Sequence, residues 1–226
     1  MERFRLWDLP TRLFHWLLVL CVCGSFVSAK IGGNAMVWHG RFGLVVVGLL
    51  AFRLVWGFVG STYARFTHFV RGPATILAYL RGQWHGAGHN PLGALSVLAM
   101  LGTLLLLVAT GLFANDDIAF EGPLYALIGK ELSDRLVGIH RLVEPLIILL
   151  VVTHIAAIIY YVGFRRERLV MPMIRGWKAG SGEPAKGGGA VAFVVALIVA
   201  LAAVYGASGA WIKAPPPAPA STTPDF

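Results

Sequence analysis

Five long apolar stretches, separated by short polar segments, dominate the pattern of the chain. A helix needs roughly 20 mostly apolar residues to cross hydrocarbon about 30 Å thick. Each of the five stretches has about that length. Asp8 followed by Pro10 is typical of a helix start, and so is Asn90 followed by Pro91. We therefore predict five membrane-spanning helices, at about residues 9–29, 37–58, 91–113, 136–164 and 190–211.

Three other segments are too short or too polar to span a membrane. Residues 72–84 fit an interfacial helix or a turn packed on the bundle. Residues 179–189 are rich in glycine and predict a flexible linker between residues 1–178 and the last helix. The proline-rich end, residues 212–226, is expected to be an extended or disordered tail outside the membrane.

The composition agrees with a membrane protein. Hydrophobic residues make up 57% of the chain and charged residues 13%, and the mean hydropathy is +0.72. A soluble domain has about 25% charged and about 45–50% apolar residues, and a disordered chain has too few apolar residues to match. The predicted fold class is therefore all-α: a polytopic membrane helical bundle, with four helices in residues 1–178 and a fifth, C-terminal transmembrane helix.

Most of the 19 lysines and arginines fall on one side of the predicted membrane. On that side are Arg3, Arg5, Arg12, Arg65, Arg71, Arg81, Arg165, Arg166, Arg168, Arg175, Lys178 and Lys186. The opposite side has Lys30, Lys130, Arg135 and Lys213, and its longest loop is acidic. Basic loops face the cytoplasm, so we predict a cytoplasmic N-terminus and an external C-terminus. The net charge of +8 then indicates contact with anionic membrane lipid, not with nucleic acid.

Four of the seven histidines, His15, His39, His140 and His154, lie within predicted spans. Ionisable residues are costly in a membrane and usually face the bundle interior, where they serve a function. The fourteen residues from His140 to His154 make almost four turns and about 21 Å. One face of this helix therefore carries an imidazole at two depths. The topology predicts that His15 meets His154 toward the cytoplasm and that His39 meets His140 toward the outside.

Two stacked imidazole pairs between bundle helices suit two haem groups, each with two axial histidines. Arginine suits the carboxylates of haem propionates. Arg12, Arg41 and Arg141 lie within three residues of a predicted ligand, and Arg53 follows His39 by fourteen residues. Two alternatives stay open: Arg12 as an ordinary cytoplasmic surface residue, and Arg53 extending to the headgroups.

Two further residues have more than one interpretation. Glu144 lies one turn after His140 and can accept a proton from a quinol, or pair with a neighbour such as Arg141. His89, in the turn before the third span, can contact a propionate or a quinone, or only support the helix start. His68 and His85, in the cytoplasmic loop, have no predicted role.

Several short motifs occur in an order that is specific as a set. They are W-D-L-P-T-R-L-F-H-W at 7–16, H-G-R-F-G at 39–43, R-L-V-W-G at 53–57, G-H-N-P-L-G at 88–93, and H-R-L at 140–142 with His154. Through them, about residues 5–178 resemble the bacterial cytochrome b561 family, which includes the cytochrome b subunits of nickel–iron hydrogenases.

The resemblance implies a four-helix core in the bacterial inner membrane that holds two haem b groups. Its ligands map onto His15, His39, His140 and His154. It also implies electron transfer between membrane quinone and an external redox partner, such as a c-type cytochrome, a hydrogenase or another dehydrogenase. The fifth helix and the tail lie outside the family pattern and can serve to dock a partner.

Two other functions remain open from the sequence. The first is a superoxide- or substrate-oxidising quinone reductase that acts alone, with Lys30, Arg41 and Arg141 as a cationic pocket. The acidic outer loop argues against attraction of an anion. The second is a haem-free membrane anchor subunit, which would tolerate replacement of any one of the four histidines.

Overall fold

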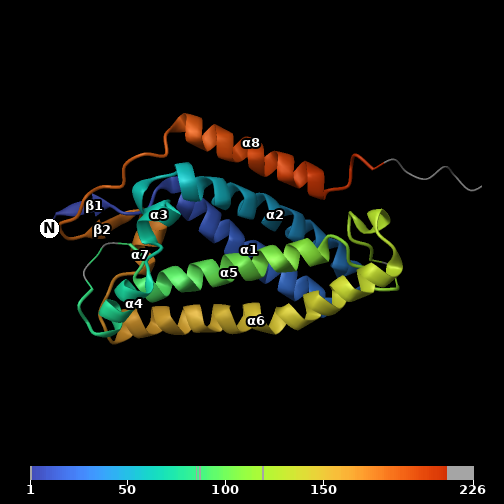
Figure 1. The fold of residues 1–226 in the computed structure, drawn as a ribbon, viewed down its shortest axis with the longest axis horizontal. Coiled ribbons are helices and arrows are strands. Elements are labelled where there is room, and N and C mark those ends of the chain that lie inside the picture. Colours follow the sequence, from blue (N-terminus) through green and yellow to red (C-terminus); the bar gives the residue numbers. More distant parts are fainter. Residues whose placement is uncertain (1, 85, 87, 119, 213–226) are drawn as a thin grey trace, which may run out of the picture.

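The five apolar stretches form long helices that run side by side (Figure 1). The computed structural model describes all residues except 1, 85, 87, 119 and 213–226, so His85 and nearly all of the proline-rich tail lie outside the described residues. All five predicted spans are confirmed. The long helices are α1 (Leu9–Ile31), α2 (Met36–Val59), α5 (Pro91–Gly111), α6 (Lys130–Gly163) and α8 (Ala190–Ala207).

Short elements gather at the two ends of the bundle (Figure 1). The end with most of the arginines, named here the basic end, has β1 (Arg3–Arg5), η2 (Thr62–Ala64), α3 (Phe66–Phe69), α4 (Pro73–Leu80), α7 (Val170–Arg175) and β2 (Trp177–Ala179). The other end, named here the acidic end, has η1 (Gly33–Ala35) and the loop 112–129 with η3 (Tyr125–Leu127). The helix α4 lies within the segment predicted as interfacial.

The predicted helix starts form as expected. Asp8 Oδ1 accepts a hydrogen bond from the Thr11 amide at 2.6 Å, which caps α1. The other Asp8 oxygen accepts from Trp56 Nε1 at 3.2 Å and from the Ser61 hydroxyl. Asn90 Oδ1 caps α5 in the same way, 2.7 Å from the Gly93 amide. Because Asp8 is buried and bonds residues at the end of α2, the cap also joins the first two spans.

The helix α6 begins six residues before the predicted start of its span. Its first turns are stabilised by two i,i+4 ion pairs, Lys130 with Asp134 at 2.9 Å and Arg135 with Glu131 at 2.6 Å. The Ser133 hydroxyl also donates to the Phe113 carbonyl at 2.8 Å. Apolar length predicts where a helix crosses hydrocarbon, and it misses a charged extension outside it. The fifth span was predicted too long, because α8 ends at Ala207 rather than near residue 211.

The helix α2 is the centre of the bundle. It packs against α1, α5 and α8, and α5 packs against α6. Trp56 and Leu50 of α2 are almost completely buried. Small residues let neighbouring helices approach: a Cβ on Gly48 would lie 2.7 Å from Val204 Cγ2 of α8. The residues that α2 brings to the interior are therefore held on three sides.

A two-stranded antiparallel sheet was not predicted. β1 pairs with β2, with Phe4 opposite Lys178, and brings the N-terminus against the segment after α6. Residues 179–189, predicted as a flexible linker, are also held by bonds to η2. The Thr62 amide donates to the Lys186 carbonyl at 2.9 Å, and the Tyr63 hydroxyl donates to the Glu183 carbonyl at 2.7 Å. A strand of three residues is too short to show an alternation of hydrophobic and polar residues in the sequence.

Deletion of residues 190–226 is expected to leave α1, α2, α5 and α6 assembled. The shortened chain would lose the Phe193 ring, which lies 5.9 Å from Phe52 and 6.3 Å from Trp56, so its midpoint of thermal unfolding should fall. Thermal unfolding of the detergent-solubilised protein, followed by size-exclusion chromatography, measures both effects. Phe193→Ala in the full chain is the matched control. A truncated protein that only aggregates would show that α8 belongs to the core.

Candidate haem sites

At the acidic end, α2 and α6 bring two histidine rings close together, nearly perpendicular to one another. The ring centres of His39 and His140 are 6.1 Å apart, and the ring planes are inclined by 77°. An iron atom about 2 Å from a nitrogen of each of two imidazoles would put the ring centres about 6 Å apart. The observed separation therefore suits two axial ligands of one iron.

Hydrogen bonds define which nitrogen of each ring is free. His39 Nδ1 lies 2.9 Å from the Ser25 carbonyl, and His140 Nδ1 lies 3.0 Å from the Leu107 carbonyl. A carbonyl can only accept, so Nδ1 carries the proton in both rings. The hydroxyls of Ser25 and Thr110 lie 3.0 and 3.1 Å from the same two nitrogens. In the neutral form of each ring this leaves Nε2 as the nitrogen that can bind a metal.

A cavity of about 660 Å³ adjoins this pair and is lined mainly by apolar side chains of α1, α2, α5 and α6. Its size is within the range of cofactor pockets. Gly40, Gly43 and Gly111 lie in its wall, and no atom lies within 4 Å of where a Cβ on Gly43 would be. The donor set, the ring separation and the cavity fit a large flat apolar group such as haem.

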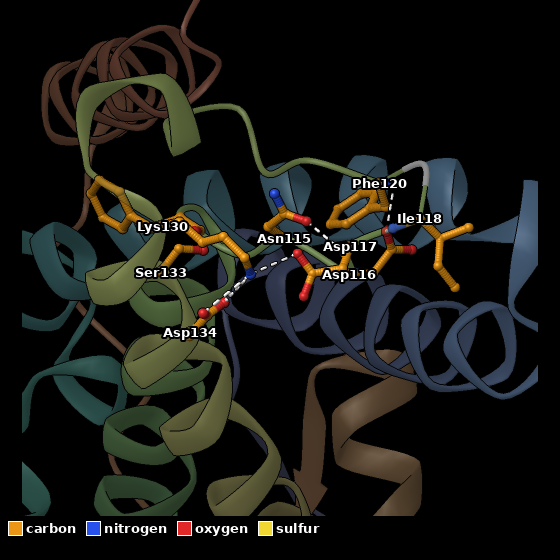
Figure 2. A network of polar contacts seen from close by, with 9 residues as sticks. Asn115, Asp116, Asp117, Ile118, Phe120, Lys130, Ser133 and Asp134 are labelled. Atoms are coloured by element: carbon orange, nitrogen blue, oxygen red, sulfur yellow. Dashed lines mark hydrogen bonds and ion pairs between the residues drawn. The ribbon is translucent and has the colours of Figure 1, made fainter.

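Loop 112–129, the acidic-end loop, forms part of the wall of this cavity. Figure 2 shows the polar contacts that shape it: Asp116 Oδ1 accepts from the amides of Ile118 and Phe120 at 2.9 and 2.8 Å. Lys130 contacts Asp117 at 2.7 Å and so ties the loop to α6. Phe120 lies against the His39 ring, with centroids 6.5 Å apart. The loop thus places an aromatic ring beside His39 in the cavity wall, a position that the sequence did not suggest.

The charged residues near this cavity differ from expectation. Glu144 pairs with Lys30 of α1, at 2.8 Å, and not with Arg141 as considered from the sequence. The C-terminal end of α1 lies beside α6, so the partner comes from another helix. Arg141 lines the cavity. Arg41 is exposed, stacks on the Trp38 ring at 4.8 Å and does not line the cavity.

At the basic end, α1 and α6 bring His15 and His154 within electrostatic range of one another. His89, just before α5, lies within range of both. The rings of His39 and His140 thus lie together as expected from topology, and His15 and His154 lie in one another's neighbourhood further along α6 toward the basic end. His15 Nδ1 is buried and has no hydrogen-bond partner among the described residues.

That nitrogen belongs to a group of buried polar atoms at the basic end that lack a protein partner. Leaving such an atom unpaired costs about 1–3 kcal/mol. Within the described part of the chain, every buried side-chain nitrogen or oxygen without a partner lies in this group: Thr11 Oγ1, Arg12 Nε, His15 Nδ1, Arg53 Nη1 and His89 Nδ1. Four of the five are nitrogens, so a ligand with acidic oxygens fits the site.

Arg53 is the most deeply placed cation of this group. Its side chain is only 4% exposed, and its guanidinium lies 4.7 Å from the Phe66 ring centre. It therefore does not extend to the headgroups, which the sequence had left open. Arg12 has a partly structural role, because its Nη1 donates to the Ile174 carbonyl at 2.6 Å.

His89 lies between the rings of Trp7 and Phe69, with centroids 4.9 Å from each. Burial, together with the nearby charges of Arg53, His154 and His15, lowers the pKa of His89 to about 3. The ring is thus neutral at physiological pH. It also lines a second cavity, of about 320 Å³, at the basic end.

The sequence analysis missed the residues that orient the acidic-end pair. Ser25 and Thr110 are polar residues in otherwise apolar helices, which is a weak signal for a buried hydrogen bond. Their partners depend on how α1 and α5 are rotated against α2 and α6, and helical periodicity alone does not determine this rotation. Phe120 gave no signal, because a single aromatic residue in a loop is common.

The family model of prokaryotic cytochrome b561 matches residues 6–176. Two curated relatives from Escherichia coli, strains K12 and O157:H7, are each named "probable Ni/Fe-hydrogenase 1 B-type cytochrome subunit". Each is 25% identical, over a stretch that covers 46% of this chain and 57% of the relative. No solved structure matches the chain significantly. The family match begins directly after β1, extends to the end of α7 and includes all four histidines of the predicted pairs, so the chain belongs to the prokaryotic cytochrome b561 family.

Proposed function

We propose that the chain binds two haem b groups and transfers electrons across the bacterial inner membrane, between quinone and an external redox protein. The observation that carries the proposal is the acidic-end pair. The ring centres of His39 and His140 lie 6.1 Å apart beside a cavity of about 660 Å³, and each Nδ1 bonds a carbonyl. Haem iron, when bound, alternates between the ferric and ferrous states and so carries one electron at a time.

The basic end is proposed to hold the second haem between His15 and His154. Arg53, His89 and Arg12 have buried nitrogens without partners there, and we assign them to the propionates. Arg141 is proposed to contact a propionate of the acidic-end haem, because it lines that cavity. Arg41 is left out of this set, since its guanidinium stacks on Trp38 outside the cavity.

Quinone is proposed to bind in the smaller, basic-end cavity. Aromatic side chains of Tyr63, Phe69 and Trp84 line it and suit a flat ring. His68 and Arg71 offer hydrogen-bond donors in the same wall. His89 lies between this cavity and the electrostatic neighbourhood of His15 and His154, so an electron leaving the basic-end haem would have a short way to travel.

We propose that the basic end faces the cytoplasm, as the distribution of arginine and lysine indicates, and that the C-terminus lies in the periplasm. The external partner then meets the acidic end. A dehydrogenase of the hydrogenase type is supported by the names of the relatives. A c-type cytochrome also fits, because a basic surface would complement the acidic loop.

The competing role as a superoxide oxidase gains little from the structure. Of its three candidate cations, Lys30 is neutralised by Glu144 at 2.8 Å and Arg41 lies outside the cavity. The same ion pair gives Glu144 a partner on α1. Arg141 remains beside an acidic loop that would repel an anion.

His154→Ala is expected to remove the basic-end haem and keep the acidic-end one, and His140→Ala should do the reverse. Each variant would lose one axial ligand of a single iron, so haem per chain should fall from two to one. Pyridine haemochrome assay of purified protein measures this number. His68→Ala, outside both pairs, should keep two haems. Unchanged haem content in both ligand variants would refute the assignment, and would favour a haem-free anchor if the wild type also lacked haem.

His89→Ala is expected to keep two haems and to slow electron transfer to quinone about tenfold, because it removes the ring between the basic-end haem and the cavity. Stopped-flow oxidation of the dithionite-reduced protein by a short-chain quinone measures the rate. Asn115→Ala, at the acidic end, is the control. An unchanged rate would argue against quinone at this cavity, and loss of one haem would show that the propionate contact of His89 is essential for holding the haem.

A further inference from the structure

We infer that Thr110 and Ser25 are positioning residues that act through His140 and His39 to lower the redox potential of the acidic-end haem below that of the basic-end haem. The inference rests on the proposed ligation of two haems. It gives a cause for a difference in redox potential between the two haem sites, and this difference sets a direction for electron flow.

Thr110 is held so that it can only accept from His140. Its hydroxyl lies 2.8 Å from the Leu106 carbonyl and 3.0 Å from the Leu107 carbonyl, and its one proton points to them. The oxygen lone pair is then left for His140 Nδ1, at 3.1 Å. The side chain is 3% exposed, so water does not compete. His140 Nδ1 therefore has two acceptors, the Leu107 carbonyl and the Thr110 hydroxyl.

Ser25, on α1, likewise gives His39 Nδ1 two acceptors. Its carbonyl lies 2.9 Å and its hydroxyl 3.0 Å from His39 Nδ1. The carbonyl belongs to the main chain of α1, so it remains after substitution, whereas the hydroxyl can be removed. Both rings at the acidic end thus combine a carbonyl with a hydroxyl.

The basic end lacks this arrangement. No hydrogen bond reaches the ring of His15 or His154 from any described residue, and His15 Nδ1 is buried without a partner. Thr11 lies one turn before His15, yet its hydroxyl is also unpartnered. Thr153, next to His154, donates to the Leu149 carbonyl at 2.8 Å.

The difference has a defined effect on an iron atom held at Nε2. A hydrogen bond from Nδ1–H makes the imidazole a stronger donor. A stronger donor stabilises the ferric more than the ferrous state and so lowers the potential. Arg53, buried within electrostatic range of His89, which neighbours both basic-end ligands, acts in the opposite sense, because a positive charge favours the added electron. Electrons then run downhill from the acidic end to the basic end.

The test is an optical redox titration of the purified, haem-loaded full chain. Thr110→Val and Ser25→Ala should each shift the lower-potential haem upward, with a larger shift in the double variant, and leave the higher-potential haem unmoved. Thr110→Ser keeps the hydroxyl and should restore the wild-type value. Thr103→Val is the matched control, being a buried threonine of the same helix, and should shift neither haem.

The outcomes separate this inference from the proposed function. Two haems in every variant with an unmoved lower potential, or an equal shift of both potentials, would overturn the inference and leave the ligation standing. A wild-type protein without haem would overturn both. If Thr110→Val fails to load its haem, Ser25→Ala becomes the deciding test of the inference. In that variant the main-chain carbonyl of residue 25 still accepts from His39 Nδ1. Electron paramagnetic resonance of the ferric haems gives a second reading, because the low-spin g values should change only at the acidic-end haem.

Discussion

Polar groups inside hydrocarbon must find their partners within the protein, because lipid offers none. This constraint organises the bundle around its histidines. At the acidic end the Nδ1 atoms of His39 and His140 are satisfied by carbonyls at 2.9 and 3.0 Å, and the other side of each ring faces a cavity. At the basic end the constraint is violated by a group of unpartnered atoms. Such a concentration of unmet polar groups calls for partners other than the protein itself, such as water or a polar ligand.

The helix α2 links the two ends. It carries His39 near one end and Arg53 near the other, and its own packing is supported by α1, α5 and α8. Trp56, one turn after Arg53, is fully buried and donates to Asp8, the cap of α1. A displacement of α1 would therefore disturb the surroundings of Arg53. The extra helix α8 lines neither cavity, and it supports α2, which carries His39 and Arg53, through close contact at Gly48.

Much of this arrangement follows from simple physical regularities in the sequence. Apolar length predicts the five spans, and the residues Asp8 and Asn90 predict two helix starts. The fourteen-residue interval between His140 and His154 predicts two depths on one helix face, and these residues lie where that spacing requires. Their role as iron ligands stays a prediction. Family membership, expected from short ordered motifs, is confirmed by a match over residues 6–176.

Features that depend on the rotation and contact of separate helices could not be predicted in this way. Three such features join segments distant in sequence. They are the acceptors of the acidic-end rings, the Lys30–Glu144 pair at 2.8 Å and the contact of Phe120 with His39. The pairing of β1 with β2 is equally hidden, since three residues show no alternation. A single apolar helix tolerates many rotations about its axis, and only the packed bundle selects one.

If the histidines bind two haems as proposed, the redox potentials at the two ends of the bundle would differ for two independent reasons. The hydrogen bonds to the acidic-end rings favour the oxidised iron, and the buried guanidinium of Arg53 favours the reduced iron at the basic end. Asp8, within electrostatic range of Arg53, offsets part of that charge. Asp117 and Glu121 of the acidic loop are exposed, so salt screens them strongly, whereas Asp116 is half-buried and lines the larger cavity. The potential difference should therefore depend on a few buried groups, while the exposed charges mainly serve to orient a partner.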